Sequence, residues 1–456
     1  MKPVRLKGWT ALRSFAWFVT NPVLGTRRIH QEYGPFVELT GPRRSKGGEQ
    51  SAILMIADSE LYREMLTDTD KWRNTQIVTS ARWSEATRRL SKGVTRLTGE
   101  RHAYYRKLLT PPLKRPPILA LAPDMARTAA EHVASWPTDI PLITTHIVKP
   151  LTSSLATYLV LGDDLQRAKP IVELSDLAIQ ASLPLPTPAF FRYLVKAAEL
   201  EQALLSWAED KRGQPQGRDI LSIIANAPDE SGNPPSAEII GGITGFVFAA
   251  AYDTCQNTLS WTLLMLSQYP EIAQALAAEI DDALEGGPVT IQKVGELPML
   301  NNVVRETMRL FTPIPIKMRK STRPASLGGV EVGAAQRVVI AALEINCNPT
   351  MYPDPHEFRP QRWDTIKPTP FEYTVFGAGG RMCPGVTFGL QLVKLAIATI
   401  VSQRVIELAP RAKVDYRLRV TLQPAGNVSV ILRHRGAPYR RVPLRGRIRD
   451  LVRLEA

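Results

Sequence analysis

The chain has 456 residues, of which 44% are hydrophobic and 22% are charged, and its formal net charge is +14 at pH 7. This composition is that of a globular protein and excludes a disordered or fibrous chain. The longest apolar run, residues 241–252, is too short to cross a bilayer, and three widely spaced cysteines exclude a disulfide framework. We therefore expect a cytoplasmic protein without a transmembrane anchor.

Helical periodicity dominates the chain, and the stretches with strand character are short. In chain order, the pattern predicts strands at 36–40 and 51–57, helices at 200–211, 237–267, 271–284 and 298–311, a strand at 336–342, a helix at 386–404 and a strand at 428–432. The predicted fold class is mainly α with small β-sheets. Because no long polar linker divides the chain, we expect a single domain over residues 1–456.

Both ends of the chain are basic. Residues 1–20 join basic residues to a short apolar patch, so we weigh an amphipathic segment in peripheral contact with a membrane against an ordinary helix. Residues 433–456 hold eight arginines, and we predict a solvated and partly mobile tail. No nucleic-acid-binding motif accompanies these charges, so we expect no nucleic acid partner.

One glycine-rich segment carries a cysteine: FGAGGRMCPG, residues 376–385. A phosphate-binding loop of the dinucleotide type requires G-x-G-x-x-G between a strand and a helix, and Met382 occupies the third glycine position. The alternative is a loop that presents the Cys383 thiolate to iron, with glycines that let the backbone turn tightly and direct amide N–H groups at the sulfur. The second interpretation accounts for more of the residues.

The segment resembles the haem-binding loop of the cytochrome P450 family, F-x-x-G-x-R-x-C-x-G. Phe376, Gly379, Arg381, Cys383 and Gly385 match it at every fixed position. The resemblance implies a haem b (iron protoporphyrin IX) cofactor with Cys383 as the axial iron ligand. It also implies that Phe376 shields the sulfur and that Arg381 contacts a haem propionate.

Two further motifs follow the order of the family. Glu306 and Arg309 form E-x-x-R on a predicted helix, where residues three apart share one face. The stretch Pro360-Gln361-Arg362-Trp363 supplies the later P-x-R-aromatic motif. The resemblance implies that Glu306, Arg309 and Arg362 form a buried charge network that is structural and not catalytic.

The helix predicted at 237–267 contains the sequence AAYDT, residues 250–254, which resembles the oxygen-binding segment of the family although Ala251 replaces its usual glycine. The resemblance implies that Asp253 and Thr254 are catalytic and deliver protons during oxygen activation. The simpler alternative is that Thr254 hydrogen-bonds back to the Ala250 carbonyl while Asp253 faces solvent.

Basic residues in two other segments match family positions that bind the haem propionates. His102 and Arg106 stand one helical turn apart in GERHAYYRKLL, and Arg319 lies in IKMRKS. With Arg381, they would provide four donors for two carboxylates. By resemblance, the haem lies between the long helix and the cysteine loop, and the substrate pocket draws on residues 74–83, 183–191, 248–250, 313–316 and 425–428.

The family resemblance implies a monooxygenase that inserts one oxygen atom of O2 into a lipophilic small molecule by hydroxylation or epoxidation. Electrons would come from a separate partner, for which the positive charge favours an acidic ferredoxin or flavodoxin with its reductase. Two alternatives stay open: a haem-thiolate peroxygenase or isomerase, and a non-catalytic haem-binding module.

Overall fold

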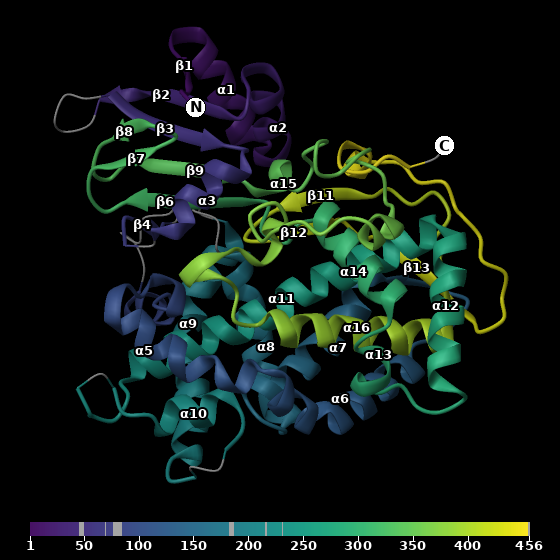
Figure 1. The fold of residues 1–456 in the computed structure, drawn as a ribbon. Coiled ribbons are helices and arrows are strands. Elements are labelled where there is room, and N and C mark those ends of the chain that lie inside the picture. The colour runs from purple at the N-terminus through teal and green to yellow at the C-terminus, as the bar shows by residue number, and fades with distance from the viewer. Residues whose placement is uncertain are drawn as a thin grey trace. The chain divides into compact units, whose positions relative to one another are not determined.

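The structure is a computed structural model that describes residues 1–44, 50–68, 70–75, 84–181, 187–214, 217–229 and 231–454. Figure 1 shows helices throughout, with strands in small sheets. The chain divides into two compact units. Unit 1 is formed by Met1–Gln76, Met308–Cys383 and Arg449–Glu455, and unit 2 by Ile77–Thr307 and Pro384–Ile448. The single domain over 1–456 stays a prediction.

Unit 1 is built on a six-stranded sheet with the strand order β1-β2-β3-β9-β6-β4. The β1–β2 and β3–β9 pairs are parallel and the other pairs are antiparallel. The strands are β1 (Val4–Leu6), β2 (Phe36–Arg44), β3 (Gln50–Ile56), β4 (Trp72–Asn74), β6 (Ile316–Ser321) and β9 (Arg337–Ala341). A two-stranded hairpin of β7 (Ala325–Leu327) and β8 (Val330–Val332) completes the strands described in this unit.

Both faces of this sheet are buried, because successive side chains of its central strands alternate between two cores. Leu54 and Ile56 of β3 pack with helix α3 (Ser59–Thr67), whereas Met55 between them packs with α1 (Gly8–Thr20) and α2 (Pro22–Tyr33). The same alternation holds on β9. The remaining short elements of the unit are α15 (Ala342–Ile345) and the 3-10 turns η3 (Pro360–Asp364), η4 (Thr374–Phe376) and η5 (Gly379–Arg381).

Unit 2 is mostly helical and is organised around α11 (Ala237–Gln268), which packs against α4, α7, α9 and α16 (Figure 1). Its other helices are α4 (Glu85–Leu90), α5 (Gly99–Leu109), α6 (Arg115–Ser135), α7 (Thr144–Val160), α8 (Leu165–Gln180), α9 (Pro188–Lys211), α10 (Ile220–Asn226), α12 (Pro270–Leu284), α13 (Ile291–Val294) and α16 (Val386–Gln403). Helix α14 (Pro298–Leu310) begins in unit 2 and ends in unit 1. Two small sheets join β10 (Arg404–Leu408), β13 (Ser429–His434) and β5 (Pro141–Ile143), and β11 (Asp415–Leu418) with β12 (Leu422–Ala425).

Local signals fix the ends of α11. Ser236 caps the helix by accepting a hydrogen bond from the Ile239 amide (3.4 Å), and Pro270 opens the next helix directly after Tyr269. Within the helix, threonine hydroxyls donate to carbonyls one turn earlier, as Thr258 does to Thr254 O at 2.9 Å. Such back-bonding satisfies polar groups in a helix whose second half is almost entirely buried.

The predicted elements are confirmed with small shifts at most ends, and one helix is much longer than expected: α9 begins at Pro188 and not at residue 200. By length and composition, α16 is the one helix of the described ranges that could cross a membrane. Two thirds of that span is buried, as in the core helix of a globular protein.

The prediction of a solvated tail at residues 433–456 holds for most of its arginines, which are exposed, and is wrong for Arg433 and for the apolar residues of the segment. Arg433 Nε lies 2.9 Å from Glu407 Oε2, and its Nη1 lies 3.0 Å from Asp139 Oδ1. Leu444, Ile448 and other apolar residues of the segment are buried. Counting arginines missed these apolar residues, which alternate with the charges and anchor the segment.

Candidate active site

The cysteine loop has a tight backbone structure, and Cys383 is the last residue of the second segment of unit 1. The Cys383 amide donates to the Phe376 carbonyl (2.8 Å), which folds the loop back on itself around η5. Gly377 and Gly379 adopt φ values of +70° and +64°, which side chains rarely allow. A Cβ on Gly379 would lie 2.5 Å from the Leu66 carbonyl oxygen of α3, so only glycine fits there. The loop leaves Cys383 exposed and outside any disulfide.

Two cations of β6 extend from the same face of the strand, because they are two residues apart. The Lys317 ammonium donates to the Thr374 carbonyl of η4 and lies 3.5 Å from the Tyr62 hydroxyl. The pKa of Lys317 is lowered to about 7, mainly by burial and also by the neighbouring Arg319 cation, while the sulfur of Cys383 opposes the shift. Lys317 therefore ties β6 to the segment that leads into the cysteine loop.

Arg319 is 8% exposed, and its Nε has no hydrogen-bond partner within the described chain. Burial lowers the pKa of Arg319, the Tyr62 hydroxyl raises it and the Arg381 guanidinium lowers it. Among the residues that the structure describes, no carboxylate contributes to these pKa shifts of Lys317 or Arg319. Clustered cations of this kind fit an anionic ligand, since unpaired buried charge is costly. The two propionate carboxylates of haem meet that description.

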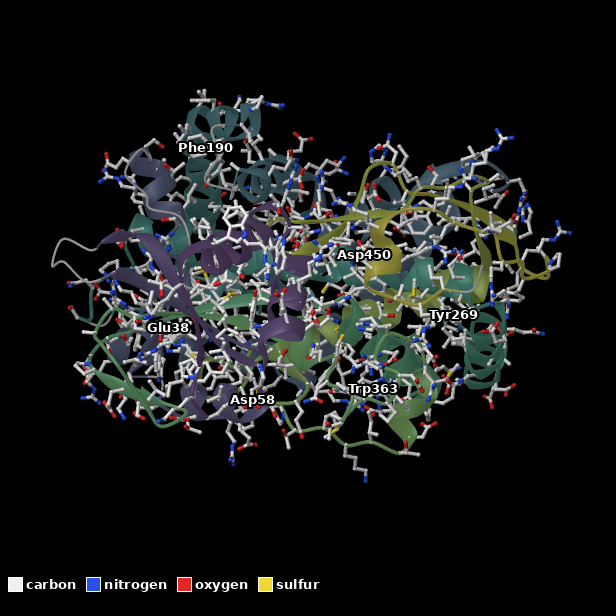
Figure 2. All side chains as sticks on the ribbon, turned by 90° about the horizontal axis from the view of Figure 1, so that it is seen from above. Glu38, Asp58, Phe190, Tyr269, Trp363 and Asp450 are labelled. Atoms are coloured by element: carbon white, nitrogen blue, oxygen red, sulfur yellow. The ribbon has the colours of Figure 1, made fainter. Side chains whose placement is uncertain are left out.

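The buried arginines of the predicted charge network brace the segment before the cysteine loop. Arg309 donates to the carbonyls of Asn346 (3.1 Å) and Pro355 (2.7 Å), and Arg362 donates to that of Pro353 (2.7 Å). Both arginines also reach the Glu357 carbonyl, at 3.3 and 3.4 Å. Trp363, next to Arg362 on η3, is labelled in Figure 2.

A short chain of hydrogen bonds leads from this network to the cysteine loop. The Asn346 side-chain oxygen accepts from the amide (2.8 Å) and the hydroxyl (3.0 Å) of Thr374, two residues before Phe376. Asn346 also donates to the Thr312 hydroxyl at 2.7 Å. Glu306 is buried on α14, one turn before Arg309. Sequence reasoning missed Asn346, for which no local motif gives a signal.

Asp253 occupies a closed polar network inside unit 2. Its Oδ2 accepts from the Thr421 hydroxyl (2.7 Å) and its Oδ1 from the Asn257 amide (3.3 Å), which also donates to Thr421 (2.9 Å). The carboxyl is 6% exposed, so the alternative in which Asp253 faces solvent is wrong. The Asn257 side-chain oxygen is buried and has no hydrogen-bond partner in the part of the chain described.

The pKa of Asp253 is raised to about 6, mainly by burial and also by the Asp176 carboxylate. The hydrogen bonds from Thr421 and Asn257 and the Lys149 ammonium oppose this shift. A buried acid with such a pKa exchanges its proton near neutral pH. The spacing of Asp253 and Asn257, four residues apart on one helix, could have indicated their contact; nothing in the sequence pointed to Thr421.

The remaining predicted site residues, among them Thr254 and the predicted propionate ligands of α5, are half-buried. Thr254 is half-buried, and its hydroxyl donates to the Ala250 carbonyl at 2.8 Å, as the simpler alternative expected. His102 and Arg106 are half-buried one turn apart on α5. In unit 1, Phe376 and Arg381 are half-buried on either side of Gly379.

Parts of the predicted substrate pocket lie outside the described residues, namely 76–83 and 183–186. Residues 187–191 belong to the start of α9, where the rings of Phe190 (Figure 2) and Phe191 stand edge to face with centroids 5.8 Å apart. Residues 248–250 belong to α11, and 313–316 precede or begin β6. These segments are apolar, as predicted.

Comparison with known proteins places the chain in a family. The model of the cytochrome P450 family matches residues 5–426. The cyclooctat-9-en-7-ol 5-monooxygenase of Streptomyces melanosporofaciens is 26% identical over 394 residues, 81% of this chain and 82% of that protein. The germacrene A hydroxylase of Cichorium intybus is 33% identical over 187 residues, 40% of this chain and 38% of that protein.

Among solved structures, the haem domain of cytochrome P450DA aligns with a TM-score of 0.78 and 22% identity, covering 97% of this chain and 98% of that one. This likeness shows the fold and confirms the mainly α architecture with small sheets. Members of the family use lipophilic substrates, O2 and redox partners. The chain belongs to the cytochrome P450 family and is a haem-thiolate monooxygenase with haem b as its cofactor.

Proposed function

We propose that Cys383 binds the haem iron and that His102, Arg106, Arg319 and Arg381 hold the haem propionates. Lys317 and Arg319, the buried cations beside the cysteine loop, support this assignment, because no carboxylate of the described residues acts on the pKa of either one. Glu306, Arg309 and Arg362 keep the segment before the loop in place through the carbonyl contacts of the two arginines.

Bound haem supplies the iron that activates dioxygen with electrons from a partner, and the role of Asp253 is to hold and release a proton for that step. When Asp253 is protonated, its Oδ1–H can donate to the Asn257 side-chain oxygen, which has no partner in the described chain. This requires the Asn257 amide group to flip, so that its oxygen takes the place of the nitrogen that now faces Oδ1. Loss of the proton restores the observed contact, with the Asn257 amide as donor. Thr254 would pass protons onward by turning its hydroxyl away from the Ala250 carbonyl.

The substrate class is an apolar, terpenoid-like molecule that undergoes hydroxylation or epoxidation. Two observations support it. The described parts of the predicted pocket, such as Phe190 and Phe248, are apolar or aromatic, and the two relatives named above are a monooxygenase of cyclooctat-9-en-7-ol and a hydroxylase of germacrene A.

The electron donor is an acidic ferredoxin or flavodoxin with its reductase, in the cytoplasm. The net charge of +14 supports an acidic partner, because opposite charges steer association. Reduction rates with an acidic ferredoxin should fall as salt is added; rates independent of ionic strength would exclude charge steering.

The decisive experiment compares the wild-type holoprotein with Cys383→Ser and Cys347→Ser. The wild type and the Cys347 variant should give the carbon monoxide difference spectrum of thiolate-ligated haem, and the Cys383 variant should lose it. A Cys383 variant that keeps that spectrum would refute the assignment. Turnover with reductase and O2, compared with turnover by peroxide alone, then separates a monooxygenase from a peroxygenase.

A further inference from the structure

Exposed apolar side chains concentrate on one helix of unit 1. Twelve large hydrophobic residues of the described chain are exposed, and six of them lie within the first 19 residues. Four belong to α1: Trp9, Leu12, Phe15 and Val19, which are 76%, 49%, 39% and 59% exposed. Single exposed hydrophobic residues are ordinary, but a group of large ones on one element marks an interaction surface.

The four residues form one stripe, here called the α1 face. Their spacing of three, three and four places them along one side of a helix. The other side of α1 buries Ala11 and Ser14, where the helix packs against α2 and β2 (Figure 1). Folding of the unit therefore uses one side of α1 and leaves the apolar α1 face to a partner.

The charged side chains of the segment that contains α1 are all basic. Residues 1–31 contain six lysines and arginines and no aspartate or glutamate. Arg5 pairs at 3.0 Å with Glu38 of β2, which is labelled in Figure 2, and Arg13 and Arg27 also pair with carboxylates. Lys2, which precedes β1, and Lys7, the N-cap residue of α1, are exposed and form no ion pair with the described residues. The partner is therefore expected to be apolar and negatively charged.

We propose that the α1 face docks on the surface of a bilayer that contains anionic lipid. The helix has 13 residues, so it is about 20 Å long and cannot span a hydrocarbon core of about 30 Å. It would lie in the plane of the interface, with the apolar stripe among the acyl chains and with Lys2 and Lys7 among the headgroups. An anionic protein would meet the same charges, but the uninterrupted apolar stripe favours lipid.

Docking on a bilayer would favour the monooxygenase activity proposed above, and this benefit rests on that proposed function. A lipophilic substrate partitions into the bilayer, so an enzyme held at its surface meets a higher local concentration of it. The docking itself depends only on α1 and its charges and not on the haem site.

The test is co-sedimentation of the full-length holoprotein with vesicles of phosphatidylcholine alone or of phosphatidylcholine mixed with phosphatidylglycerol. The variant Trp9→Ser/Phe15→Ser removes two apolar side chains, and Lys2→Gln/Lys7→Gln removes two charges. Ile140→Ser is the matched control, since Ile140 is an equally exposed hydrophobic residue (50%) in unit 2. Haem content and thermal unfolding should be unchanged in all three variants, because each altered side chain is exposed.

Wild type and Ile140→Ser should bind the anionic vesicles at least tenfold more tightly than the neutral ones. Loss of two lysines should weaken anionic binding by about 30-fold, from about fivefold for each charge near the surface. The Trp9/Phe15 variant should lose binding to both. Wild type that sediments with neither vesicle, or a Trp9/Phe15 variant that binds like wild type, would overturn the proposal. If the wild type binds no vesicles but forms dimers, and the Trp9/Phe15 variant is monomeric, the α1 face is an interface with a second copy of the chain. An unchanged carbon monoxide spectrum in these cases leaves the proposed function standing.

Discussion

Replacing Asp253 with asparagine should make the protein more stable and less active. The folded-state pKa of about 6, against an ordinary value of 3.8, means that the fold binds the proton more tightly than the unfolded chain does. A difference of about two units corresponds to about 3 kcal/mol. Below pH 3.8, Asp253 is protonated in both the folded and the unfolded chain, so its burial costs no stability. As the pH rises from about 4 to 6, stability falls, and above pH 6 the whole cost is present.

Asparagine has the same shape and cannot ionise, so Asp253→Asn removes this cost. At pH 8 the variant should be more stable by up to about 3 kcal/mol, or about 3 °C in melting temperature for a chain of this length. Near pH 4 the two proteins should unfold alike. Turnover should fall by about 100-fold, because the residue can no longer release a proton.

The assay is thermal unfolding of wild type and variant at several pH values between 4 and 8, with turnover measured at pH 7.5. Asp139→Asn is the control: this exposed carboxylate faces Arg433, which lowers its pKa, so the variant should gain no stability as the pH rises. The reasoning is refuted if the Asp253 and wild-type curves stay parallel across the range. Lower stability of the variant at pH 8 would also refute it, since it would mean that Thr421 stabilises the anion more than burial penalises it.

Three further changes test unit 1. Gly379→Ala should lower the free energy of unfolding by at least about 2 kcal/mol and lower haem content, because the added Cβ would lie 2.5 Å from a backbone oxygen of α3 at a φ of +64°. Gly333 faces open space, so Gly333→Ala should have the stability and the haem content of the wild type. Lys317→Met should speed haem loss to an acceptor protein by removing the contact with the Thr374 carbonyl, whereas the exposed Lys367→Met should not. Arg362→Lys should lower the free energy of unfolding, measured by chemical denaturation, by about 2 kcal/mol or more, because lysine cannot reach several carbonyls at once.

Each of these expectations has a contrary outcome. Normal haem content in Gly379→Ala would mean that the loop and α3 move apart at little cost. Equal haem loss in the Lys317 and Lys367 variants would remove Lys317 from the cofactor site. A stable Arg362→Lys protein would show that one carbonyl contact suffices to hold the segment before the loop.

Features that depend on residues close together in the sequence could be predicted without the structure. The cysteine loop could be recognised because its function requires particular residues at fixed spacings: a thiolate, a cation and glycines in conformations that other residues resist. Helix ends were predicted within a few residues where prolines and a capping serine mark them, as at Ser236 and Pro270. The start of α9 was missed by 12 residues, since Pro188 was not taken as a first helical residue.

The sequence by itself thus determined the family and the positions of the long helix and the cysteine loop, because each depends on neighbours within a few residues. Only the tertiary structure decided the surroundings of the charged groups. Asp253 meets Thr421, 168 positions away, and Lys317 meets Thr374, 57 positions away. The physical reason is that the proton affinity of a carboxyl or an ammonium depends on burial and on partners that chain packing brings together, and periodicity along the chain carries no record of either.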